Sequence, residues 1–281
     1  MVDPEIRPAV HCDGVVVSNE PVSSGLIRID LEMDQPISFQ PGQFAMLNLA
    51  GSASLVFSRP FSIFEADGRR MSFLYRVVGS GTRSMDALTA GDTMTFLGPL
   101  GRPFPEPEAG QSVVLIAGGV GLPPLAAWLA HHNENSGVEI NAFFGARDGA
   151  DVPWGLLKDR WDVSVDSPRD IPEGRLAWEG RVTDLAASRE DLREGRDRMV
   201  LACGPTPLLK AAARFAEERG WDCWLSLEEH MGCGYGVCKG CVVPVHDPDN
   251  GPDALRNATC CEEGPVFNAA VLAWERPRGP Q

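Results

Sequence analysis

The sequence predicts an α+β multidomain chain with an N-terminal antiparallel β-barrel, an α/β domain built on a parallel sheet, and a small cysteine-rich C-terminal domain. Three observations predict it. Short apolar runs separated by turn formers fill the first third of the chain, strands then alternate with helices, and closely spaced cysteines follow near the end. We expect the domain boundaries to be 1–104, 111–225 and 226–281.

The first region reads as all-β. Its apolar runs recur about every 10 to 20 residues, which is typical of a barrel or a sandwich. They lie at residues 14–18, 26–31, 44–49 and 71–78. Residues 99–110 are rich in Pro, Gly and Glu. We interpret this stretch as the linker to the second domain.

The second region alternates strands with helices, which predicts a parallel sheet. A helix is predicted to run through Trp128 and Leu129, and another over 207–219, with Pro207 at its start and Gly220 just past its end. Strands are predicted at residues 112–117, 138–144 and 199–203.

Composition narrows the class of protein. The chain has 281 residues, a hydrophobic content of 43% and a net charge of −14, so nucleic acid and anionic membranes are expected to be repelled. No stretch approaches the roughly 20 apolar residues that span a bilayer. The chain begins with Met-Val-Asp-Pro-Glu and shows no apolar signal region, so we expect a cytoplasmic protein.

Cysteine spacing is the most specific signal in the sequence. Cys233, Cys238 and Cys241 are separated by four and then two residues, and Cys260 and Cys261 follow at a distance. This is the ligand order of a plant-type 2Fe-2S cluster, and the interleaved glycines let the backbone wrap around such a group. A zinc site is the main alternative, although zinc ribbons favour two CxxC pairs. Disulfides are the weaker alternative.

Two motifs of the barrel region suit a flavin nucleotide. In residues 58–62, Arg59 can meet a phosphate, Phe61 can pack on a flavin ring and Ser62 can bond to its edge. An Arg-Pro turn ahead of a strand is the alternative. Residues 74–76 and 79–82 offer a second anion contact, for which a plain hairpin turn is the alternative.

Two glycine motifs of the α/β region suit a dinucleotide. Gly118, Gly119 and Gly121 follow a predicted strand and open a helix, where backbone donors can meet a diphosphate. They do not form the GxGxxG fingerprint. Residues 202–205 (Ala-Cys-Gly-Pro) end another strand. Cys203 is interpreted either as a small buried residue or as a contact of the nicotinamide ring.

The order of these motifs resembles the ferredoxin reductase superfamily of flavin and nicotinamide enzymes, and within it the electron transfer subunits of class 1B dihydroorotate dehydrogenases. The resemblance covers nearly the whole chain. Stretches shared with many flavin reductases are residues 59–62, 74–76, 81–82, 97–101, 117–121 and 203–205. The specific stretches are 226–228 with 231–234, and 261–267.

The resemblance implies a role for each matching residue. Residues implied to bind FAD are Arg59, Pro60, Phe61, Ser62, Leu74, Tyr75, Arg76, Gly81 and Thr82. Residues implied to bind NAD(H) are Gly118, Gly119, Gly121, Cys203, Gly204 and Pro205. The implied cluster ligands are Cys233, Cys238, Cys241 and Cys261. Cys261 is preferred to Cys260 because the family's fourth ligand directly precedes an acidic or polar pair and Gly-Pro-Val-Phe.

The resemblance also implies the reaction and the partner. A hydride carrier exchanges two electrons and the cluster one, so a flavin must stand between them. A catalytic subunit carrying FMN is implied to oxidise dihydroorotate in pyrimidine biosynthesis and to pass electrons through the cluster and FAD to NAD+, in a heterotetramer. We therefore expect no acid-base dyad and no nucleophile. The five histidines are expected to be surface or structural groups.

Two other functions remain open at this stage. One is a related iron-sulfur flavoprotein reductase subunit serving ferredoxin or a bifurcating complex; some such relatives carry aspartate in place of the first cluster cysteine, which is Cys233 here. The other is a zinc-binding interaction module. The choice between NAD and NADP is open too, because Arg147 and Asp148 follow the second α/β strand. Residues 246–253 look like an enlarged loop, and the acidic stretch 187–198 has no assigned role.

Overall fold

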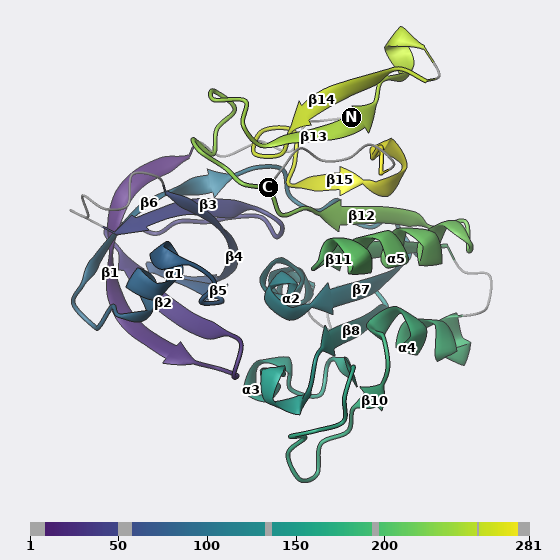
Figure 1. Cartoon of the computed structure of the whole chain (residues 1–281), viewed down its shortest axis with the longest axis horizontal. Coiled ribbons are helices and arrows are strands. Elements are labelled where there is room, and N and C mark those ends of the chain that lie inside the picture. Colours follow the sequence, from purple (N-terminus) through teal and green to yellow (C-terminus); the bar gives the residue numbers. More distant parts are fainter. Residues whose placement is uncertain (1–8, 50–57, 133–136, 193–196, 252, 275–281) are drawn as a thin grey trace.

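The computed structural model describes residues 9–49, 58–132, 137–192, 197–251 and 253–274. Six antiparallel strands close a barrel in the order β1-β2-β5-β4-β3-β6 (Figure 1). The short helix α1 (Ser80–Asp86) follows β5. The strands are β1 (Val10–Pro21), β2 (Ile27–Met33), β3 (Phe44–Leu49), β4 (Arg59–Asp67), β5 (Arg70–Tyr75) and β6 (Thr93–Leu100).

The second unit is a seven-stranded sheet in the order β10-β9-β8-β7-β11-β12-β15. Its strands run parallel except β15, which pairs antiparallel with β12. The sheet is made of β7 (Ser112–Gly118), β8 (Ile140–Ala146), β9 (Asp162–Val165), β10 (Trp178–Glu179), β11 (Arg198–Cys203), β12 (Asp222–Ser226) and β15 (Val266–Asn268).

Helices cover both faces of this sheet. Figure 1 shows α2 (Leu122–His131) between the sheet and the barrel, and α4 (Val182–Ser188) and α5 (Thr206–Glu217) on the opposite side. Every residue of β7 is buried, as a central strand covered on both faces requires, and this explains its continuous apolar sequence. The short helices of this part are η1 (Gly119–Gly121), η3 (Gly149–Asp151), α3 (Trp154–Leu157) and η4 (Glu190–Leu192).

The cysteine-bearing segment forms a hairpin and rejoins the sheet. Strands β13 (Val242–His246) and β14 (Leu255–Thr259) pair antiparallel, with η5 (Pro248–Asn250) at the tip of the hairpin. The enlarged loop of the sequence lies at that tip, apart from residue 252, which lies outside the described residues. After β14 the chain adds β15 to the sheet edge and continues into η6 (Ala269–Val271).

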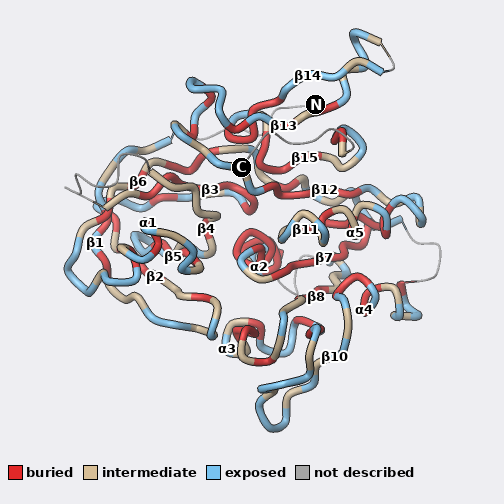
Figure 2. The backbone as a smooth tube through the Cα atoms, in the orientation of Figure 1, coloured by how far each residue is buried: buried red, intermediate tan, exposed pale blue. Residues whose placement is uncertain are grey.

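Three buried clusters hold these parts together, and Figure 2 shows burial concentrated along the barrel wall, the central strands and α2. One fills the barrel around Ile29, Phe73 and Phe96. A second joins α2 to one face of the sheet. The third packs α4 and α5 on the other face and continues into the cysteine segment and the barrel residues Met46 and Leu100. The cysteine segment therefore shares a core with both larger units.

The predicted fold class is confirmed, and two details of the sequence reading change. Residues 79–82 do not form a hairpin turn, since they cap and open α1. The acidic stretch 187–198 has a structural role where it is described. Arg198 is 1% exposed and donates to the carbonyl of Asp191 at 2.8 Å, so β11 fixes the end of η4. Residues 193–196 of that stretch lie outside the described residues. Within the part of the chain that the structure describes, no helix is long and apolar enough to cross a membrane.

Candidate functional site

A cavity of about 390 Å³ lies between the barrel, the sheet and the start of the cysteine segment, and we call it the barrel cavity. Strands β4 and β5 supply one wall, and the glycine turns after β7 and β11 supply the facing wall. Predicted site residues lining it are Pro60, Phe61, Ser62, Leu74, Tyr75, Arg76, Thr82, Gly118, Gly119, Gly121, Cys203, Gly204 and Pro205. The structure thus brings the predicted flavin and nicotinamide motifs to one cavity.

Arg59 and Gly81 do not line this cavity, but they contact each other. The Arg59 guanidinium packs directly over the Cα atom of Gly81 in the first turn of α1. Thr82 lines the cavity, yet its hydroxyl oxygen already accepts the backbone N–H groups of Val78, at 2.9 Å, and Gly79, at 3.1 Å. The hydroxyl therefore shapes the turn that carries it.

Tyr75 forms part of the apolar wall of the barrel cavity. Its ring meets Phe61 edge-on at 6.3 Å between centroids, and its hydroxyl donates to Asn19 Oδ1 at 3.0 Å. Burial raises the pKa of Tyr75 to about 12. The phenol is thus neutral at physiological pH, and its ring, which is fully buried, supports Phe61 from behind.

A second cavity, of about 420 Å³, lies along the carboxyl ends of the parallel strands, and we call it the sheet-edge cavity. Ligands of open α/β sheets bind at such strand ends. It shares four lining residues with the barrel cavity, which are Arg76, Gly118, Gly119 and Pro205. An extended ligand could therefore reach from one cavity into the other past these residues.

The shared wall depends on a close approach of two strand ends. Strands β7 and β11 pair in parallel with Ala117 opposite Cys203, so the turns after them meet. A Cβ atom at Gly121 would collide with the backbone of Cys203 and Gly204. Burial raises the pKa of Cys203 to about 12, despite a hydrogen bond with Ser226 that acts in the opposite direction. Cys203 therefore presents a neutral thiol to the cavity.

Arg147 and Asp148, whose side chains bear on the choice between NAD and NADP, differ in whether they line the sheet-edge cavity. Arg147 lines the sheet-edge cavity, but its Nε donates to Asp151 at 2.6 Å. Asp148 is not among the lining residues, and its carboxylate accepts the N–H of Asp151 at 3.2 Å as the cap of η3. The only acidic side chains that line the described part of this cavity are Asp151 and Asp166.

The predicted cluster cysteines lie in two pairs. The N–H of Cys238 points at Cys233 Sγ at 3.4 Å, and the two thiols interact. The N–H of Cys261 points at Cys241 Sγ at 3.3 Å, and these thiols also interact. A 2Fe-2S cluster takes four cysteine thiolates, two for each of its irons. The two pairs fit that requirement.

Backbone N–H groups surround the sulfur atoms, as hydrogen bonding to a thiolate requires. The N–H of Gly236 lies 3.1 Å from Cys261 Sγ, and Gly236 has a φ of 82° that favours glycine. Partial burial acts to raise the pKa of Cys233, but N–H groups led by that of Cys238 lower it to about 7. Burial, together with the neighbouring Cys241 thiol, raises the pKa of Cys261 to about 12.

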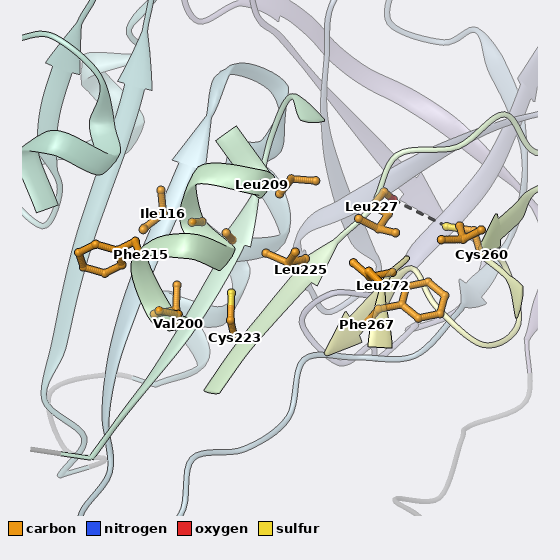
Figure 3. Packing of buried hydrophobic residues seen from close by; sticks show 14 of the residues in the cluster. Ile116, Val200, Leu209, Phe215, Cys223, Leu225, Leu227, Cys260, Phe267 and Leu272 are labelled. Carbon is orange, nitrogen blue, oxygen red and sulfur yellow. Dashed lines mark hydrogen bonds between the residues drawn. The ribbon is translucent and has the colours of Figure 1, made fainter. Parts of the chain in front are cut away.

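Cys260 faces away from this group of thiols. It is 0% exposed and lies in the core shared by the sheet and the cysteine segment. Its Sγ lies 3.9 Å from the carbonyl oxygen of Leu227, an interaction that Figure 3 shows among Leu225, Phe267 and other apolar side chains. No described set of three or more His, Cys, Asp or Glu side chains converges closely enough to enclose a single metal ion.

The loop between β12 and β13 that carries Cys233, Cys238 and Cys241 (residues 227–241), which we call the cysteine loop, adjoins the barrel cavity. Met231 lines that cavity two residues before Cys233, and Pro265 lines it four residues after Cys261. A Cβ atom at Gly234 would collide with the side chain of Met46, so the loop packs directly on β3. A group held by the thiols would thus sit next to a group held in the barrel cavity.

Comparison with known proteins decides the family. Residues 228–273 match the family described as the iron-sulfur cluster binding domain of dihydroorotate dehydrogenase B. The chain is 37% identical over 238 residues to the dihydroorotate dehydrogenase B (NAD(+)) electron transfer subunit of Shouchella clausii, covering 81% of this chain and 84% of that one. This chain belongs to that family.

Other members of the family are similar at comparable levels. The electron transfer subunit of Listeria monocytogenes serotype 4b is 32% identical, with 90% of this chain and 95% of the relative covered. That of Bacillus caldolyticus is 34% identical, with 83% and 86% covered. The predicted family is therefore confirmed.

Solved structures show how widely the fold is shared. An NADH-dependent reduced ferredoxin-NADP oxidoreductase aligns with a TM-score of 0.75 over 98% of this chain and 92% of its own, at 24% identity. The cytochrome b5 reductase domain of Ulva prolifera nitrate reductase aligns with a TM-score of 0.60 over 75% and 93%, at 20% identity. These likenesses establish the ferredoxin-reductase-like fold.

Sequence reasoning missed most of the sheet-edge cavity and one wall of the barrel cavity. The missed barrel-cavity residues with polar or flexible side chains are Ser226, Glu228, Glu229 and Met231; those in the sheet-edge cavity are Asp151, Ser164, Asp166, Arg181 and Thr183. The signal that could have found several of them is position just after a parallel strand. This signal requires the strands to be known, and neither β9, which is only four residues long, nor β12 was predicted from the sequence.

Proposed function

We propose that this chain is the electron transfer subunit of an NAD-dependent dihydroorotate dehydrogenase. It would relay electrons from a catalytic partner subunit through a 2Fe-2S cluster and FAD to NAD+. Family membership supports the reaction and the need for a partner. By the same resemblance we propose that the partner carries FMN and that the two subunits form a heterotetramer.

One observation carries the proposal. Met231 and Pro265 line the barrel cavity, and they lie two residues before Cys233 and four residues after Cys261, so both ends of the proposed cluster site adjoin that cavity along the chain. When bound, FAD supplies the conversion between two-electron hydride transfer and single-electron transfer. The residues of this chain would hold the donor and acceptor sites next to each other.

The barrel cavity suits a flavin ring. Phe61 would pack on the ring with the buried Tyr75 behind it, Pro60 and Leu74 would complete the apolar wall, and Ser62 would bond to its edge. Arg59, fixed over Gly81 at the start of α1, would hold a phosphate of FAD with the backbone of Thr82. The neutral phenol of Tyr75 donates to Asn19 and suits a structural role rather than proton transfer.

NAD(H) would occupy the sheet-edge cavity and extend toward the flavin. The backbone at Gly118 and Gly119, which line this cavity, would approach its diphosphate, with Gly121 at the adjoining wall of the barrel cavity. Cys203, with Gly204 and Pro205, would line the nicotinamide end, and its protonated thiol would act as a neutral contact.

The cluster would be held by Cys233 and Cys238 on one side and by Cys241 and Cys261 on the other. This assignment is supported by the two thiol pairs and by the N–H groups that point at their sulfur atoms. The orientation of Cys260 toward the Leu227 carbonyl argues against Cys260 as the fourth ligand. Hydrogen bonds of this kind tune the potential of such a cluster.

The test is reconstitution with the catalytic subunit encoded by the same organism. The purified complex should contain FAD, FMN, iron and acid-labile sulfide, and it should reduce NAD+ when dihydroorotate is added. This chain alone should oxidise NADH with ferricyanide but should not oxidise dihydroorotate.

Two results would overturn the proposal. One is a chain that binds zinc and no flavin. The other is a complex whose dihydroorotate oxidation proceeds at the same rate with and without this chain when NAD+ is the acceptor.

A further inference from the structure

A buried carboxylate joins the barrel to the α/β unit beside the sheet-edge cavity. Asp151, at the end of η3, is 4% exposed. It accepts from Ser24 Oγ at 2.7 Å and from Arg147 Nε at 2.6 Å. Ser24 belongs to the turn between β1 and β2, and Arg147 follows β8, so one carboxylate links the two units.

Arg76 lies against the same carboxylate from the barrel side. Its Nε donates to the carbonyl of Gly25 at 3.2 Å. A Cβ atom at Gly25 would lie 2.9 Å from Asp151 Oδ1 and 3.1 Å from Arg76 Nη2, so carboxylate and guanidinium crowd around one glycine. The N–H of Ser24 also donates to the carbonyl of Ala150 at 2.9 Å. The turn that carries Ser24 and Gly25 is thus fixed to η3.

Arg147, which bonds to Asp151, and Arg76, which lies near it, both line cavities. Arg76 lines the barrel cavity and the sheet-edge cavity, and Arg147 lines the sheet-edge cavity. The hydrogen bond from Arg147, with that from Ser24 and against the effect of burial, holds the pKa of Asp151 below its usual range. The three side chains therefore carry one net positive charge where the cavities meet.

Such a group suits a diphosphate that passes between the cavities. The planar guanidinium of arginine can donate two parallel hydrogen bonds to a phosphate. The affinity that these bonds provide depends on how firmly the guanidinium is held in the right orientation. The buried carboxylate of Asp151 holds the Arg147 guanidinium through a hydrogen bond and acts on the nearby Arg76 guanidinium through its charge, which offsets the repulsion between the two arginines.

We propose that Asp151 is a positioning residue for NAD(H), which orients Arg76 and Arg147 toward the diphosphate of the dinucleotide. The inference deepens the proposed function, because it rests on NAD(H) binding in the sheet-edge cavity. It assigns the diphosphate to the wall formed by Arg76, Gly118 and Gly119, where the two cavities join.

The test uses the intact flavin- and cluster-loaded chain with NADH as donor and ferricyanide as acceptor. Asp151→Asn keeps the side-chain shape and removes the charge. It should raise the KM for NADH about tenfold, the size expected for a lost charge-assisted hydrogen bond, with kcat within about twofold of native. Inhibition by ADP-ribose, which carries the diphosphate, should weaken by a similar factor. Inhibition by adenosine, which lacks it, should not change.

Two further variants keep the test decisive. Ser24→Ala removes the hydrogen bond from Ser24 to Asp151. It should weaken inhibition by ADP-ribose about twofold to threefold, and inhibition by adenosine should again be unchanged. Asp159→Asn is the matched control, because Asp159 is exposed and pairs with Arg175 at 3.3 Å, outside both cavities. It should leave every constant unchanged.

The inference is overturned if Asp151→Asn leaves the inhibition constant of ADP-ribose within twofold of native. It is also overturned if inhibition by ADP-ribose and inhibition by adenosine weaken by the same factor. Should Asp151→Asn fail to fold, Ser24→Ala decides alone, and an unchanged ADP-ribose constant overturns the inference. Failure of the proposed function is distinct. It would appear as a native chain that oxidises no NADH or supports no dihydroorotate-dependent NAD+ reduction.

Discussion

The cysteine loop and the sheet-edge cavity are built by opposite means. Three of the four proposed cluster ligands lie within residues 233–241, and the backbone of that same segment supplies N–H groups to the sulfur atoms. The sheet-edge cavity takes its lining from the ends of β7, β8 and β9 and from the starts of α4 and α5. A local site of the first kind can be recognised from spacing, whereas a site of the second kind exists only after the sheet has formed.

The two regions also differ in what provides the binding chemistry. In the cysteine loop, glycines and backbone N–H groups surround the thiols, and the ion pair between Lys239 and Glu262, at 3.0 Å, lies exposed beside them. In the sheet-edge cavity, charged side chains fixed by buried partners provide it, with Asp151 as the clearest case. The loop should therefore be sensitive to backbone changes and the cavity to side-chain charge.

The largest expected effect is loss of the cluster from the cysteine loop without a change in NADH oxidation. Cys238→Ser should abolish the cluster and lower NAD+ reduction by dihydroorotate in the complex by more than about a hundredfold, since loss of outer partners of a metal site already costs about 10–100-fold. NADH oxidation with ferricyanide should stay within about twofold. Iron content, low-temperature EPR of the reduced protein and the two assays measure this.

Cys260 provides the control for that experiment. Cys260→Ala should retain iron, because its thiol faces the Leu227 carbonyl, while Cys261→Ser should lose it. Iron lost from Cys260→Ala and kept in Cys261→Ser would reverse the ligand assignment.

The next effect tests how far the wall between the two cavities depends on the close packing of the turns after β7 and β11. Gly121→Ala should lower the free energy of unfolding by about 1–3 kcal/mol, because the new Cβ collides with the backbone of Cys203 and Gly204. It should also weaken NADH binding, measured as KM, while the cluster spectrum is unchanged. Thermal unfolding followed by circular dichroism gives the stability.

Gly155→Ala is the matched substitution for Gly121→Ala. Gly155 lies in α3 and a Cβ atom there would meet nothing within 4 Å. Its stability should be unchanged or slightly raised, as alanine favours helix. Equal destabilisation by both variants would show that the close approach at Gly121 is not the cause.

A smaller effect tests the backbone of the cysteine loop. Gly236→Ala should destabilise the loop by about 1–2 kcal/mol, because residue 236 has a φ of 82° and a Cβ atom there meets the carboxylate of Glu262. Cluster loss during incubation with a chelator should be faster, and the KM for NADH should not change. Gly240→Ala, where the nearest atom would be 3.6 Å from the new Cβ and φ is ordinary, should lose iron at the native rate. Equal rates in both variants would contradict the backbone argument.

The smallest effect is the pH dependence of Asp151. Its pKa is lowered in the folded chain, chiefly by the hydrogen bond from Arg147, so its contribution to stability is present above the unfolded aspartate pKa and is lost as pH falls through the folded value. Asp151→Asn should cost about 1 kcal/mol at pH 7, given that Arg147 is largely exposed, and this difference should shrink below about pH 4. Denaturant unfolding at several pH values measures it. A difference that stays constant down to pH 3 would exclude this linkage.

Much of the architecture followed from the sequence because the signals are local. The apolar continuity of residues 112–117 identified the central strand, and the Pro and Gly at either end of the helix at 207–219 gave bounds close to those of α5. The spacing of Cys233, Cys238 and Cys241 identified a cluster-binding segment, since its ligands are neighbours along the chain. These features need no knowledge of which strands lie side by side.

Only the tertiary structure decided which residues face each cavity and why. Strand order brings the turns after β7 and β11 into contact, β15 returns the cysteine segment to the sheet, and η3 sets Asp151 against Ser24, more than 120 residues earlier in the chain. Arg147 lies only four residues before Asp151, but the partner that joins this carboxylate to the barrel, Ser24, cannot be inferred from the neighbouring sequence. The cysteines and glycines of the cysteine loop were identified by sequence, because one segment supplies both the thiols and the backbone around them. The charged wall of the sheet-edge cavity was decided by packing, because segments far apart in the chain meet there.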